Sequence, residues 1–173
     1  MNTVLLANLI KIRWIAIVGQ LITLFTIFFI FNFTIPLTEC LFVVLLSILV
    51  NFTSYFIQRG NSTLNDKKTF LFLLFDISQL VGLLFLTGGV FNPFVVLILA
   101  PIIISASYLS AFWTILLSLY SILLILIINF NYIPLNWEQN FIIPSIYNIG
   151  ILVALIITII FLAIYAYLFA SSA

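Results

Sequence analysis

Scarcity of charge is the feature that most limits what this chain can fold into. Among its 173 residues there are five basic and four acidic side chains, while 66% of the residues are apolar. A soluble domain carries charge on about a quarter of its residues, so a soluble fold is excluded. Because a membrane-spanning helix needs about 20 predominantly apolar residues, we predict an all-α integral membrane protein.

Polar and turn-forming residues divide the sequence into six apolar runs. These runs predict six transmembrane helices over residues 12–33, 38–58, 69–87, 92–109, 111–129 and 141–169. The first run is too long for the core of a cleaved signal peptide, and no small-residue cleavage site follows it. Pro101 interrupts the fourth run and should kink that helix. We expect residues 1–173 to form a single transmembrane domain.

The basic residues orient these predicted helices. They all lie at the start of the first run or between the second and the third. They are Lys11, Arg13, Arg59, Lys67 and Lys68. Since Lys and Arg near the ends of spans stay on the cytoplasmic side, six spans place both termini in the cytoplasm. A net charge of +1 gives no reason to expect a nucleic-acid partner.

The composition also narrows the chemistry. The chain has no histidine and one cysteine, which excludes clustered zinc ligands, axial histidines for haem, a Ser/His/Asp triad and a disulfide within one chain. Cys40 is expected to be a small buried residue. Asp76 is the one acid predicted deep in a span, so we predict no metal and no catalytic residues, and a membrane-embedded enzyme is poorly supported.

Three polar residues of the predicted spans, Asp76, Gln20 and Asn51, lie roughly 10 to 12 Å from the basic ends. Together with Gln79 they form a predicted polar layer. Asp76 and Gln79 share a helix face because they are three residues apart. One interpretation is a hydrogen-bonded clamp between helices; the other is a proton-linked or signalling relay. A cation reaches Asp76 only if Arg13 or Arg59 extends inward.

The segment GGVFNPF, residues 88–94, separates the third and fourth predicted helices. A glycine past a helix end, Asn92 as an N-cap and Pro93 at the first helical position predict a tight helical hairpin. The same turn offers backbone N–H groups, the Asn92 amide and the rings of Phe91 and Phe94. These groups would suit the carbonyl oxygens and ring of a quinone.

Residues 76–109, DISQLVGLLFLTGGVFNPFVVLILAPIIISASYL, resemble the membrane region of the RegB (PrrB, ActS) redox-sensing histidine kinases. The hallmark of that family is a Gly-Gly-x-x-Asn-Pro-Phe heptapeptide between the third and fourth of six spans. Its fixed positions match Gly88, Gly89, Asn92, Pro93 and Phe94. The sequence RWIAIVGQ, residues 13–20, also resembles the family's first span, so the similarity covers essentially the whole chain.

The resemblance implies a multi-pass protein of the bacterial inner membrane that reports the redox state of the quinone pool. It implies ubiquinone or a related quinone as a regulatory ligand, a homodimer surrounded by membrane lipid, and a response regulator as partner of the full-length kinase. The quinone-binding residues it implies are Gly88, Gly89, Phe91, Asn92, Pro93 and Phe94. The phospho-accepting histidine, the ATP-binding domain and the redox cysteine of the family are not in this sequence.

The end of the sequence leads to a related expectation. The sixth run is longer than a span requires and finishes in Phe-Ala-Ser-Ser-Ala without a basic anchor. We therefore expect a truncated kinase, with residues 171–173 left from a linker and a cytoplasmic domain following in the parent. The alternative is a small six-helix transporter or channel, in which Asp76 and its polar neighbours would line a path.

Overall fold

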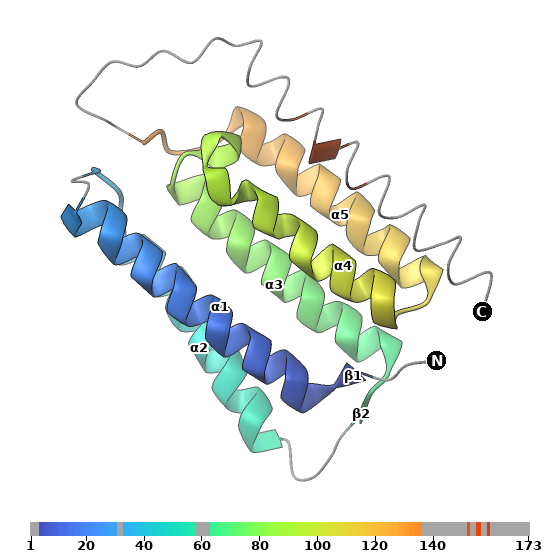
Figure 1. The fold of residues 1–173 in the computed structure, drawn as a ribbon. Helices are drawn as coiled ribbons and strands as arrows, with labels where there is room; N and C mark the ends of the chain where they lie inside the picture. Colours follow the sequence, from blue (N-terminus) through green and yellow to red (C-terminus); the bar gives the residue numbers. More distant parts are fainter. Residues whose placement is uncertain are drawn as a thin grey trace.

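The computed structural model describes residues 4–30, 33–57 and 63–135, together with residues 152, 155, 156 and 159. These residues form a bundle of long helices that lie side by side (Figure 1). The elements are β1 (Val4–Leu5), α1 (Leu6–Phe25), the π-helix η1 (Thr26–Ile30), α2 (Leu37–Ile57), β2 (Thr63–Leu64), α3 (Asp66–Leu86), the 3₁₀-helices η2 (Gly89–Phe91) and η3 (Pro93–Ile98), α4 (Leu99–Tyr108) and α5 (Ala111–Phe130). The two short strands pair antiparallel.

Four helices in the described part of the chain are long and apolar enough to cross a membrane. They are Leu9–Ile30, Leu37–Phe56, Asp66–Leu86 and Ala111–Phe130. They coincide with the first, second, third and fifth predicted spans, so the all-helical membrane character is confirmed. The count of six spans and the cytoplasmic termini stay predictions.

The fourth predicted span takes a different form. Residues Pro93–Tyr108 form a shorter apolar helix, which is 3₁₀ as far as Ile98 and α-helical from Leu99. Pro101 has no N–H to donate to the carbonyl four residues earlier, and the change of helix type lies just before it. At about 2.0 Å per residue in a 3₁₀-helix and 1.5 Å in an α-helix, the segment extends about 27 Å, close to the hydrocarbon thickness of a bilayer.

The sixth predicted span, residues 141–169, lies mostly outside the described residues, as do Arg59 and residues 171–173. The described members of that span are helical: Leu152, Leu155, Ile156 and Ile159. Leu155 and Ile159 are buried in the same apolar cluster as side chains of α3 and α5. These two side chains of the sixth run therefore pack against the bundle.

The start of α1 corrects one expectation. The first helix was predicted to begin at residue 12, but α1 already begins at Leu6 and so contains Lys11 as well as Arg13. Lysine and arginine are good helix formers, so they do not stop the helix. Arg13 lies on the buried face of α1 and is 5% exposed, while Lys11 is exposed.

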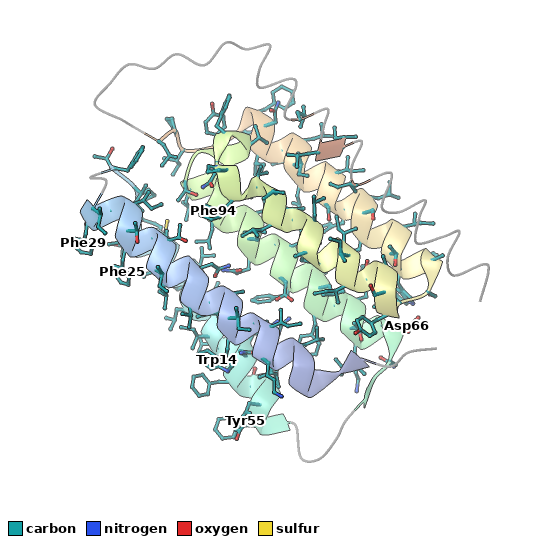
Figure 2. All side chains as sticks on the ribbon, viewed as in Figure 1. Trp14, Phe25, Phe29, Tyr55, Asp66 and Phe94 are labelled. Atoms are coloured by element: carbon teal, nitrogen blue, oxygen red, sulfur yellow. The ribbon has the colours of Figure 1, made fainter. Side chains whose placement is uncertain are left out.

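Two apolar clusters hold the bundle together. One joins α3, α4 and α5, and the other joins α1 and α2 with Leu83 of α3. Cys40 lies in the second cluster and is fully buried. Figure 2 shows Phe25 and Phe29 directed away from the bundle, and both are exposed, as are large apolar side chains of α2 and α5. An exterior of this kind suits lipid.

Candidate functional site

A cavity of about 390 Å³ lies between α1, α3 and the η3–α4 segment. Its volume falls within the range typical of small-molecule sites. Most of its wall is apolar and comes from leucines of α3 and from small residues of α1 and α4. Polar side chains line its two ends. We call the end lined by Thr87, Asn92 and Phe94 the turn end. The opposite end is lined by Arg13, Gln20, Asp76 and Gln79, and we call it the polar end.

At the turn end, Asn92 is a structural residue of the hairpin. Its Nδ2 donates to the Thr87 carbonyl oxygen at 2.9 Å and to the Thr87 hydroxyl at 2.8 Å. Its Oδ1 accepts from the Phe94 N–H at 2.9 Å, which is the predicted N-cap. The Thr87 hydroxyl in turn donates to the Leu83 carbonyl oxygen at 2.6 Å. The polar groups of this end are therefore used to shape the turn.

The two glycines of the motif face away from the cavity. Gly88 and Gly89 have φ values of 104° and 61°, which L side chains rarely adopt. A Cβ on Gly89 would lie 2.7 Å from Cγ of Tyr132 and 2.9 Å from the Ile128 carbonyl oxygen. These glycines therefore allow the turn to pack tightly against the end of α5 and the segment that follows it.

Hydrogen bonds and a ring contact secure that packing. The Gly88 N–H donates to the Ile133 carbonyl oxygen at 3.0 Å, and the Ile133 N–H donates to the Phe85 carbonyl oxygen at 2.8 Å. The ring of Phe91 meets Tyr132 edge-on, with centroids 5.8 Å apart. The GGVFNPF turn thus holds α3, η3 and the end of α5 in a fixed arrangement.

At the polar end, a buried ion pair joins α1 to α3. The Nε of Arg13 lies 2.8 Å from Oδ1 of Asp76, and the Arg13 Nη2 donates to the Phe72 carbonyl oxygen at 2.9 Å. The guanidinium also lies over the Phe72 ring, 4.7 Å from its centroid. Of the two cations that the sequence offered for Asp76, Arg13 is the one that pairs with it among the described residues.

The second polar link between these helices is an amide pair. Gln20 Nε2 donates to Gln79 Oε1 at 3.1 Å, and Gln79 Nε2 donates back to Gln20 Oε1 at 3.0 Å. A primary amide has two N–H donors and two acceptor lone pairs. Among the described residues, each glutamine therefore keeps one N–H and one carbonyl lone pair for another partner, and both side chains line the cavity.

Over 163 residues, or 93% of its length, the chain is 34% identical to the Sensor histidine kinase RegB of Cereibacter sphaeroides. The match fits an N-terminal RegB-type membrane sensor domain. The chain spans 35% of the length of that RegB. No family model matches the chain, and no solved structure matches it.

Only some of the residues that the RegB resemblance implies for quinone binding line the cavity. Asn92 and Phe94 line the cavity. Gly88, Gly89 and Phe91 pack against the segment after α5 instead. Pro93 is exposed at the first position of η3. The heptapeptide thus contributes one wall of the cavity, and most of its residues shape the turn that carries this wall.

The predicted polar layer is also divided. Asp76, Gln79 and Gln20 lie together at the polar end, whereas Asn51 does not line the cavity. Asn51 is fully buried, and its Nδ2 donates to the Ile10 carbonyl oxygen at 3.2 Å. It therefore links α2 to the start of α1. Its predicted depth, which matches that of Asp76 and Gln20, did not show that its side chain points to a different neighbour.

Gly19 is a cavity residue that the sequence did not indicate. It lies in α1 one residue before Gln20, and a Cβ built on it meets no atom within 4 Å. It lines the cavity together with Ala16 and Thr23. Small residues on one helix face are common wherever helices pack closely, so only the structure distinguishes open space from packing at Gly19.

Proposed function

We propose that this chain is the quinone-binding membrane sensor domain of a two-component histidine kinase, with ubiquinone or a related quinone as regulatory ligand. The similarity to RegB supports a membrane sensor domain of a histidine kinase. The observation that carries the ligand is the cavity of about 390 Å³ between candidate spans, which is mostly apolar and carries polar side chains toward both ends. A ring with a few oxygens and an isoprenoid tail needs such a site.

The cavity also offers a route from ligand to signal. An occupant would touch α1, α3 and the η3–α4 segment at the same time. Its presence or redox form would then change the relative stability of alternative helix arrangements, because a ligand shifts an equilibrium by its differential affinity for the two states. We propose that this change is passed to a kinase region, in a homodimer that phosphorylates a response regulator.

Blocking the cavity tests ligand binding directly. Gly19→Leu places a side chain in open space in the cavity, so ubiquinone titrated into nanodisc-embedded protein should bind about tenfold more weakly or worse, equivalent to about 1.4 kcal/mol. The matched control is Gly82→Ala, because Gly82 is also helical, does not line the cavity, and its Cβ would make an ordinary 3.7 Å contact with Val43. Unchanged affinity in Gly19→Leu would overturn the assignment of the site.

Signalling requires a separate test. In a chimera, this chain replaces the corresponding region of the Cereibacter sphaeroides RegB, and autophosphorylation is measured in proteoliposomes containing oxidised or reduced ubiquinone. The proposal predicts a rate that depends on the redox form and that loses this dependence in Gly19→Leu. An active chimera whose rate is the same with both forms would contradict redox reporting.

A further inference from the structure

We propose that the ring of the ligand lies at the polar end of the cavity, where Gln20, Gln79 and Asp76 hold its oxygens, and that its tail lies along the turn end. This inference rests on the proposed function and gives the ligand an orientation. The ring and the turn are distinct places, since Asp76 and Thr87 are eleven residues apart on α3, or about 16 Å at 1.5 Å per residue.

The turn end has little hydrogen-bonding capacity left for a ring. Both sides of the Asn92 amide bond within the turn, and the Thr87 hydroxyl is both donor and acceptor there. Five of its backbone N–H groups are also engaged, and Gly89 and Val90 do not line the cavity. The N–H groups already bonded belong to Gly88, Phe91, Asn92, Phe94 and Val95. A ring at this end would need to break the bonds that form the hairpin.

The polar end has the capacity that the turn end lacks. Each glutamine amide keeps one donor and one acceptor, as described above. Asp76 uses Oδ1 to contact Arg13, and no described residue bonds its Oδ2. The Asp76 side chain is 22% exposed against 6% for Arg13, so the carboxylate is the member of the ion pair more open to a ligand.

The spacing of these groups suits a single ring. Asp76 and Gln79 are three residues apart on α3, which places their Cβ atoms about 5 to 6 Å from each other on one face. Gln20 reaches the same place from α1 through its bonds to Gln79. One ring could therefore contact the carboxylate and the amide pair together and bridge α1 and α3.

The chemistry of the polar end distinguishes the two redox forms. A quinone oxygen only accepts hydrogen bonds, so it can take the spare N–H of Gln20 or Gln79. A quinol hydroxyl also donates, so it can bond to Oδ2 of Asp76, which as a carboxylate only accepts. Hydrogen bonds to charged groups are stronger than neutral ones. Asp76 therefore acts on the reduced form, whereas the amide pair acts on both.

The test titrates short-tail ubiquinone and, anaerobically, short-tail ubiquinol into protein in phosphatidylcholine nanodiscs. Asp76→Asn should weaken ubiquinol about tenfold and ubiquinone less than about threefold, as expected for loss of a charge-assisted bond. Gln79→Leu should weaken both forms by about fivefold to tenfold. Phe94→Leu, the matched change at the turn end, should affect both forms equally and by less than about threefold.

The failures of the two proposals are distinguishable. If wild type binds neither form, the proposed function is wrong. If wild type binds both and Gly19→Leu is unaffected, quinone binding stands but the assignment of the site, and with it the orientation, is wrong. If wild type binds but Gln79→Leu has no effect, or Asp76→Asn changes both forms alike, the orientation alone is wrong. Should Asp76→Asn not fold, the double variant Arg13→Met/Asp76→Leu removes both charges of the pair. It should give the same selective loss of ubiquinol affinity, and equal losses for the two forms would overturn the role of Asp76.

Discussion

The two ends of the cavity use their polar groups in opposite ways. At the turn end, the amide of Asn92 and the hydroxyl of Thr87 bond within the hairpin. At the polar end, the amides of Gln20 and Gln79 bond to each other and keep spare donors and acceptors. The recognisable motif therefore builds the shape of the site, and glutamines outside any motif offer the hydrogen bonds for a ligand.

Breaking the ion pair should give the largest effect and tests how the polar end is built. Arg13→Met leaves the Asp76 carboxylate without its partner, which typically costs about 3 to 5 kcal/mol in a buried pair. Thermal unfolding in detergent should show this loss. The double variant Arg13→Met/Asp76→Leu should recover most of it, because two apolar side chains of similar size can replace a buried pair. A single variant as stable as wild type would show that the pair does not hold α1 to α3.

Gly89→Ala tests the turn end with the next largest effect. The new Cβ would lie 2.7 Å from the Tyr132 ring, on a residue with φ of 61°, so we expect a loss of about 2 to 4 kcal/mol from overpacking and backbone strain. Gly82→Ala is the matched control and should change the unfolding midpoint little or raise it. Equal behaviour of the two variants would argue against tight packing of the turn on α5.

Asn92→Ala separates the structural role of the turn from ligand binding. Loss of the cap should cost about 1 to 2 kcal/mol in unfolding experiments. The folded fraction should still bind ubiquinone within about threefold of wild type, because the Asn92 amide is used within the turn. A loss of binding greater than about tenfold without loss of stability would instead make Asn92 a direct ligand partner.

The amide pair should give the smallest effect on stability. A double-mutant cycle with Gln20→Leu and Gln79→Leu should yield a coupling energy of about 0.6 kcal/mol, as is usual for hydrogen bonds between membrane helices. Each of these variants should reduce the free energy of ligand binding by more than this coupling energy. A coupling energy near zero would mean that the two glutamines do not bond in the membrane.

Local features of the fold were predictable from the sequence. The cap at Asn92 depends on the residues that follow it, and the helices of α2, α3 and α5 follow from uninterrupted apolar runs. The docking of Gly89 on Tyr132 was not predictable, because it joins residues more than forty positions apart.

The site itself was predictable only in part. Asp76, Gln20 and Gln79 were indicated by the cost of placing polar groups in a membrane. The extension of Arg13 toward Asp76 depends on where α1 begins, which its run of apolar residues did not reveal. The cavity depends on the separation of α1 and α3, and no single residue such as Gly19 encodes a separation between helices.

The most direct test of where the ring lies is a dipolar contact measured by solid-state NMR. Ubiquinone labelled with ¹³C at its two carbonyl carbons is bound to protein carrying ¹⁵N in the side-chain amides of either glutamine or asparagine. The account predicts a contact with glutamine nitrogen that disappears in the double variant Gln20→Leu/Gln79→Leu, and none with asparagine. A contact with asparagine nitrogen that disappears in Asn92→Ala would contradict the account.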